Sequence, residues 1–142
     1  MISLDTAIKL KSVGLVWRPA LHDFFAIPEH GLDDRVFVIG DMLATVEYLQ
    51  GFQVISFQGA SEWALDSIVF SEAVWMPGES QLRQVLEEIL LSMGFTGLRL
   101  ISNPNGYRCE IPTINGWRAY EASEASEAYA LAILAISFTK SE

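Results

Sequence analysis

The sequence is poor in the residues that most often carry out chemistry. Its 142 residues include one cysteine, Cys109, and two histidines. A single cysteine excludes an internal disulfide framework and a thiolate metal cluster, and it fits a reducing cytoplasm. The common arrangements of nucleophile, base and orienting group therefore have few members to draw on.

Short motifs with a known mechanism are missing as well. The chain contains no phosphate-binding loop GxxxxGK[ST], no GxGxxG, no nucleophile elbow GxSxG, no HExxH and no CxxC. We therefore expect a protein that is not an enzyme and that needs no cofactor.

Basic residues are scarce, with nine against 18 acidic residues and a formal charge of −9. Phosphate backbones and anionic membrane surfaces should repel such a chain, so we expect neither nucleic acid nor membrane as a partner. A basic protein partner is compatible with this charge. The simpler alternative is that acidity keeps a chain with 51% hydrophobic residues in solution.

Long apolar runs are also absent. The longest, residues 128–138, covers about half of the ~20 residues that a membrane span needs, so a buried helix is expected there. Residues 1–14 show no basic leader followed by an apolar run, and we expect no secretory signal.

The most legible pattern is a helix within residues 75–94. Its apolar residues recur at helical spacing and form one stripe, which consists of Leu82, Val85, Leu86, Ile89, Leu90 and Met93. Gly78 is placed as the N-cap, Gln81 as the distal half of a partial capping box, and Gly94 as the residue after the last turn. Only the polar face, with Arg83, Gln84, Glu87 and Glu88, is left to meet a partner.

The remaining pattern predicts an α+β fold in one domain, residues 1–142, with about three helices on a mostly antiparallel sheet. A first helix should begin at Ser3 and end near Gly14, and a last helix should run from about Ser123 or Ser126 to Thr139. Strands are predicted at residues 24–27, 35–39, 45–49, 52–57, 98–102, 107–111 and 117–121, with residues 29–34 as a loop and 61–70 as either helix or strand.

The last helix is apolar on nearly every face. Such a helix must be buried on more than one side, by the sheet and by either another helix or a second subunit. Its alanines Ala128, Ala132 and Ala135 form a smooth face suited to close approach.

One loop collects possible metal ligands. They are His22, Asp23, Glu29, His30, Asp33 and Asp34, with Asp41 as a further candidate. Imidazoles and carboxylates bind zinc and other divalent ions, but this spacing matches no named site and a solvated loop is the alternative.

Other candidates have equally simple structural readings. Glu62 and Asp66 are four residues apart and could form an acid–base pair, or a solvated edge. Cys109 should point inward from its strand, where a buried thiol is inert. The four tryptophans, Trp17, Trp63, Trp75 and Trp117, could line a groove or cap the core.

Three segments, SLDTAIKLKSVGLVWRP, VWMPGESQLRQVL and EASEAYALAILAIS, resemble a group of short, uncharacterised bacterial proteins, some associated with phages or mobile elements. The shared features are the G-L-x-W-x-P run, the W-x-P-x-x-x-Q-L helix start and the alanine-rich last helix, from Ser3 to about Ala135. Some members carry a pilus-assembly label, which belongs to a larger ATPase-like protein and does not fit a chain without a phosphate-binding loop. The resemblance implies no catalytic, metal or cofactor residues.

Three functional hypotheses follow. The first is a cytoplasmic, non-catalytic, acidic module that binds a basic protein partner. The second is a homo-oligomeric structural module, such as a homodimer, whose last helix forms the interface. The third is a small-ligand or metal-dependent enzyme that uses the loop from His22 to Asp41.

Overall fold

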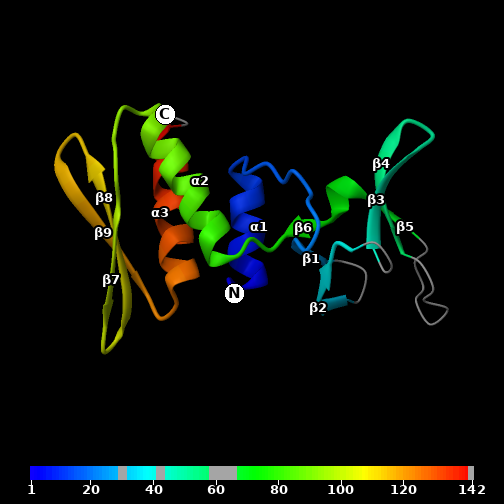
Figure 1. Ribbon diagram of the computed structural model, residues 1–142, viewed down its shortest axis with the longest axis horizontal. Coiled ribbons are helices and arrows are strands. Elements are labelled where there is room, and N and C mark those ends of the chain that lie inside the picture. Colours follow the sequence, from blue (N-terminus) through cyan, green and yellow to red (C-terminus); the bar gives the residue numbers. More distant parts are fainter. Residues whose placement is uncertain (29–31, 41–43, 58–66, 141–142) are drawn as a thin grey trace. The chain divides into compact units, whose positions relative to one another are not determined.

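The computed structural model describes residues 1–28, 32–40, 44–57 and 67–140 and has the predicted α+β composition (Figure 1). Its helices are α1 (Leu4–Ser12), α2 (Glu79–Ser92) and α3 (Ala125–Lys140), with a 3-10 turn η1 (Phe70–Glu72). Its strands are β1 (Phe24–Ile27), β2 (Leu32–Val38), β3 (Ala44–Leu49), β4 (Phe52–Phe57), β5 (Ser67–Val69), β6 (Val74–Trp75), β7 (Arg99–Asn103), β8 (Gly106–Thr113) and β9 (Gly116–Ala122). The described strands pair antiparallel throughout, in sheets ordered β2–β1–β6, β3–β4–β5 and β7–β8–β9. The α+β class and the antiparallel pairing are thus confirmed.

The chain divides into two compact units. Unit 1 consists of Met1–Leu15 and Pro77–Glu142, and unit 2 of Val16–Met76. Unit 1 holds the three helices and the β7–β8–β9 sheet, whereas unit 2 holds the other two sheets. The prediction of a single domain over residues 1–142 stays a prediction.

Helix α2 forms where its stripe and its caps predict it. The backbone N–H of Gly78 donates to Oε1 of Gln81 at 2.8 Å, which is the predicted half of the capping box. Leu82, Leu86 and Leu90 are fully buried. Met93 was expected to complete the stripe, but it is exposed because it occupies the C-cap position, beyond the last helical turn.

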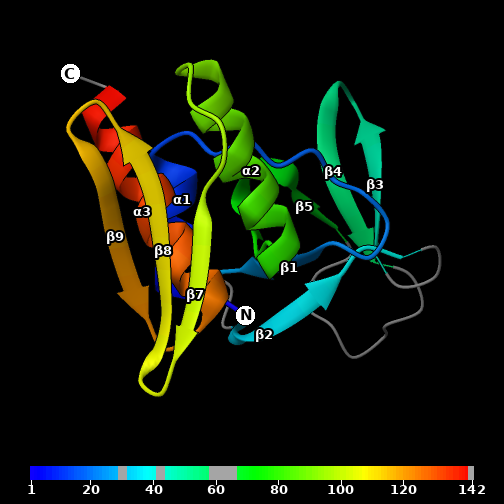
Figure 2. The ribbon, with the colours of Figure 1, turned by 60° about the vertical axis from the view of Figure 1, so that its left-hand side comes forward.

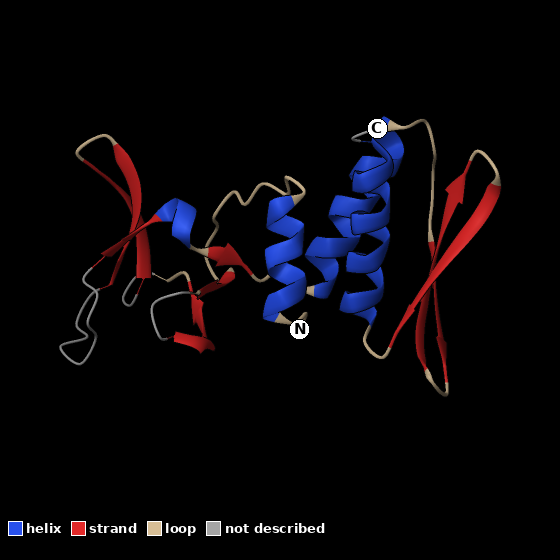
Figure 3. Ribbon diagram, turned by 180° about the vertical axis from the view of Figure 1, so that it is seen from behind, coloured by secondary structure: helices blue, strands red, loops and turns tan. Residues whose placement is uncertain are grey.

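Helix α3 is the centre of unit 1. It packs on β8 and β9 with one side and contacts α1 and α2 with others, so the sheet lies on one side of α3 and α1 on another (Figures 1 and 3). Of the three alanines of the predicted smooth face, Ala128 and Ala132 are fully buried and Ala135 is half-buried. The all-round apolar character of α3 is therefore explained by other elements of the same unit. Among the described residues, no helix is long and apolar enough to cross a membrane.

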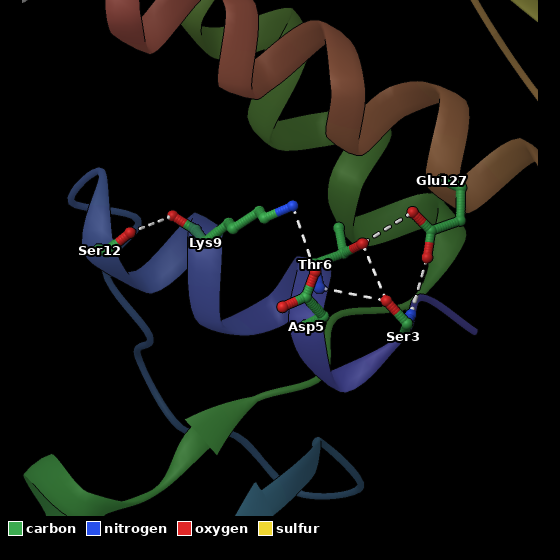
Figure 4. A network of polar contacts seen from close by, with 6 residues as sticks. All are labelled: Ser3, Asp5, Thr6, Lys9, Ser12 and Glu127. Carbon is green, nitrogen blue, oxygen red and sulfur yellow. Dashed lines mark hydrogen bonds and ion pairs between the residues drawn. The ribbon is translucent and has the colours of Figure 1, made fainter.

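Polar contacts join the beginnings of α1 and α3 (Figure 4). Ser3 caps α1, and its Oγ accepts from the N–H of Thr6 at 3.1 Å. The carboxylate of Glu127, in the first turn of α3, accepts from the Ser3 N–H at 2.7 Å and from Thr6 Oγ1 at 3.0 Å. One carboxylate thus lies at the positive ends of two helix dipoles.

Unit 2 has its own apolar core. Its buried members are Trp17, Phe25, Ile27, Ile39, Ile55 and Ala73, with Phe37, Val46, Phe70 and Trp75 packed against them. Strand β2 begins at Leu32, inside the stretch predicted as a loop, because Leu32 pairs with Ile27 after a register shift in β1. The ambiguous stretch contains strand β5 at Ser67–Val69, and its earlier part, 61–66, lies outside the described residues.

Strands β3 and β4 form the hairpin that Gln50-Gly51 predicts. Leu49 pairs with Phe52 around this two-residue turn. Gln50 and Gly51 have φ values of 51° and 85°, the positive values that a tight hairpin turn of this length requires. Because β5 pairs only with residues 54–56 of β4, the turn end of the hairpin extends past β5 (Figure 2).

Candidate interaction surface

The structure gives Asp23 a role in the fold. Its side chain is buried, and its Oδ2 accepts from Trp17 Nε1 at 2.9 Å and from the Ala20 N–H at 2.9 Å. The backbone of the same turn is tied to Ile39, since the Ile39 N–H donates to the Asp23 carbonyl at 2.9 Å. The neighbouring His22 is exposed, with φ of 75°. This carboxylate thus stabilises a turn through its bonds to Trp17 and Ala20.

Only part of the rest of the predicted metal loop lies within the described residues. Glu29, His30 and Asp41 lie outside the described residues, and Asp33 and Asp34 lie in strand β2. Among the side chains that the structure does describe, no group of three or more histidine, cysteine, aspartate or glutamate residues could hold a metal ion.

The carboxylate pairs form no described site either. Glu62 and Asp66 lie outside the described residues. Glu87 pairs with Arg83 at 3.4 Å on the exposed face of α2. The depression there is shallow and lined only by exposed side chains, namely Ser80, Arg83, Gln84, Glu87, Glu88 and Leu91.

Cys109 points inward, as strand alternation predicts. It is fully buried on the α3 side of β8, and the flanking Arg108 and Glu110 lie on the other side. Burial, with a smaller contribution from the charge of Glu110, raises the pKa of this thiol from 9.0 to about 11. Burial also raises the pKa of Tyr129, which is buried in α3. A raised pKa lowers the population of the anionic form of each group near neutral pH.

The tryptophans serve different purposes. Trp17 is buried and stacks on Phe70 at 4.9 Å between ring centroids, and Trp75 packs against the same core. Trp63 lies outside the described residues. Trp117 is half-exposed on β9, beneath the Arg99 guanidinium at 4.0 Å from the ring centroid. The structure therefore places two of the four in the core of unit 2 and one on the open face of the β7–β8–β9 sheet.

That open face is electrically balanced. Glu110 contacts Arg99 at 3.8 Å and Arg108 at 3.1 Å, and Arg108 also contacts Glu121 at 3.4 Å. Two cations and two anions thus neutralise one another. A solvated, charged face is usual for an antiparallel sheet whose other face is covered by a helix.

The net charge of the chain is concentrated in unit 2. Unit 2 has two basic and nine acidic residues, a formal charge of −7, whereas unit 1 has seven basic and nine acidic residues, a formal charge of −2. Any electrostatic attraction for a basic partner therefore comes mainly from unit 2.

Unit 2 also presents large apolar side chains to solvent at the end of the β3–β4 hairpin. We call residues 48–52 the hairpin tip. Within it, Tyr48 is 75% exposed, Leu49 49% and Phe52 65%. Tyr48 lies on one face of the hairpin, and the cross-strand pair Leu49 and Phe52 lies on the other. Both faces of the tip are therefore available for contact.

Comparison of the chain with protein-family models, curated proteins and solved structures gave no match. The assignment of function accordingly depends on the surface itself.

The sequence pattern predicts this hairpin but not the exposed apolar surface at its tip. The sequence does contain a signal for this surface. Tyr48, Leu49 and Phe52 directly flank the turn Gln50-Gly51, whereas polar residues are usual beside a solvated turn. The uneven division of charge can be recognised only once the boundaries of the two units are known, and the sequence pattern does not indicate these boundaries.

Proposed function

We propose that this protein is a non-catalytic, acidic interaction module that binds a basic protein partner through unit 2. The observation that carries the proposal is the combination, in one small unit, of a formal charge of −7 with the exposed aromatic side chains of the hairpin tip.

The charge and the tip contribute in different ways. Negative charge accelerates encounter with a basic protein and makes the association rate sensitive to salt. Aromatic side chains that become buried at an interface supply most of its binding energy, while the surrounding contacts exclude water. Tyr48 and Phe52 can also stack against lysine or arginine side chains of the partner.

The homo-oligomeric alternative is less well supported. An interface formed by α3 would need exposed apolar side chains on that helix, but the sheet, α1 and α2 pack against it, and among residues 125–137 only Leu131 is exposed. Sedimentation of the purified protein tests this alternative, because a monomer at high concentration removes it. The enzymatic alternative depends on the loop from His22 to Asp41, where Asp23 already binds Trp17 and Ala20.

The resemblance to uncharacterised bacterial and phage-associated proteins remains part of the proposal, as does a cytoplasmic location. A chain with Cys109 as its single cysteine has no internal disulfide to form, which is compatible with that location.

The test is a comparative capture from a lysate of the source organism. The intact protein and the double variant Tyr48→Ser, Phe52→Ser serve as baits, with Ile114→Ser as the matched control because Ile114 is 91% exposed in unit 1. We expect a basic protein that is retained by the intact and control baits, released as salt is raised, and lost from the double variant. Retention of the same protein by all three baits, or retention of acidic or neutral proteins only, would overturn the proposal.

A further inference from the structure

The outer edge of β3 offers backbone groups for pairing. Strand β3 ends the β3–β4–β5 sheet, and within the described part of the chain no strand pairs with its other side. Leu49 and Phe52 flank a two-residue turn, so they form a hydrogen-bonded pair. By alternation, Val46 and Tyr48 direct their N–H and C=O groups away from β4. Ile55, the partner of Val46, likewise directs its backbone groups away from β3, and it pairs with Ile68 of β5.

The other edge strands carry features that hinder further pairing. Strands β5 and β6 have only three and two residues. The pairing of β2 with β1 shifts register, and β7 and β9 carry the cations Arg99 and Arg118. Short length, irregular register and charge are the usual means by which sheet edges avoid adding a strand.

Strand β3 is neither short nor irregular in its pairing. It is six residues long and contains neither proline nor a basic residue. Its one charged side chain, Glu47, accepts from Ser56 Oγ of β4 at 3.0 Å, so this carboxylate is held over the sheet rather than at its free edge. As far as the described residues show, the edge is therefore open to an extended chain.

The negative charge of unit 2 favours a positively charged chain as the binding partner. We propose that an extended, lysine- or arginine-rich segment of the partner adds to β3 as a further strand of the β3–β4–β5 sheet. This inference rests on the proposed function and identifies the binding mode. Main-chain hydrogen bonds to Val46 and Tyr48 then provide affinity, and the basic side chains provide selectivity for unit 2.

The experiment measures the affinity of the full chain for a short, end-capped peptide of alternating lysine and valine by calorimetry. A second peptide has the same composition but carries N-methyl groups on two consecutive central residues, which block one donor on each edge of the strand. On the protein side, Tyr48→Pro removes the outward N–H, and Tyr48→Ala is the matched control that removes the ring and keeps the N–H.

We expect the unmodified peptide to bind, with an affinity that falls as salt is raised. N-methylation should weaken binding about tenfold, the effect of losing the one hydrogen bond whose donor faces β3, and Tyr48→Pro should bind about tenfold more weakly than Tyr48→Ala. The N-methylated peptide is measured on the unaltered protein, so this result does not depend on how well the proline variant folds.

Two results would overturn strand addition. One is failure of the unmodified peptide to bind. The other is equal affinity for the two peptides together with equal affinity of the two Tyr48 variants. If that second result came with salt-sensitive binding that Phe52→Ser abolishes, the acidic interaction function would stand and only the strand-addition mode would fail.

Discussion

Replacement of Glu127 by alanine should destabilise unit 1 by uncoupling α1 from α3. The variant removes the acceptor of the Ser3 N–H at 2.7 Å and of Thr6 Oγ1 at 3.0 Å. It also removes a negative charge from the N-terminal turns of both helices, where the helix dipole favours an anion.

The magnitude follows from the burial of the two bonds. Hydrogen bonds to a charged group contribute about 1.5–3 kcal/mol each when buried, but the bond to Ser3 is exposed and water can replace its acceptor. With the bond to Thr6 part-buried and two dipole contributions of about 0.3–1 kcal/mol each, we expect a loss of about 2–3 kcal/mol in the free energy of unfolding. Glu127→Gln should lose less, because its side-chain oxygen still accepts one bond.

Urea unfolding followed by circular dichroism measures this free energy, and amide hydrogen exchange locates the change. The control is Glu88→Ala on the exposed face of α2, which should change stability by less than about 0.5 kcal/mol. Equal stabilities of the Glu127→Ala and Glu88→Ala variants, with unchanged exchange in α1, would refute the coupling.

Three further predictions concern the packing of unit 1. Gly106→Ala should cost about 3 kcal/mol or more in urea unfolding, because at φ of 137° an added Cβ would lie 2.4 Å from the carbonyl oxygen of Ala122; a loss below about 1 kcal/mol would contradict this close approach. Leu86→Ala should cost about 2–5 kcal/mol and the exposed Leu91→Ala less than about 0.5 kcal/mol, so equal costs would show that the α2 stripe does not face the core. Iodoacetamide should modify Cys109 rapidly in urea and very slowly in the native protein near neutral pH, and rapid native modification would be inconsistent with a buried thiol. Since folding raises the pKa of Cys109 from 9.0 to about 11, the stability it contributes should be complete below pH 9.0 and be lost as the pH rises through about 11.

Local signals predicted most of the elements correctly. The α2 stripe, Gly78, Gln81 and Gly94 located one helix, and Gln50-Gly51 located the β3–β4 hairpin. These features act over a few residues, so they can be read without knowledge of the fold.

Features that depend on contacts between distant residues could not be predicted from the sequence. Leu32 belongs to β2 because of its pairing with Ile27, and a polar stretch gave no sign of it. The packing of a sheet and two helices against α3 could not be predicted from the sequence, because an all-round apolar helix is equally compatible with a second subunit.

The candidate surface likewise has some features that the sequence predicts and others that only the fold defines. Total charge was evident from the sequence, but its concentration in residues 16–76 required the boundaries of the two units. In the sequence, Asp23 is a candidate metal ligand because it lies next to a histidine. Its bonds from Trp17 and Ala20 form only in the folded turn, so the sequence does not reveal them.

The most direct test of the central claim is a site-resolved titration. The isotope-labelled full chain is titrated with the lysine–valine peptide, and backbone amide shifts are followed by NMR at low and at raised salt. We expect the largest shift changes at residues 45–49 and 52, smaller changes there at raised salt, and little change over residues 99–122. Changes confined to the β7–β8–β9 sheet, or a response that salt does not reduce, would contradict it.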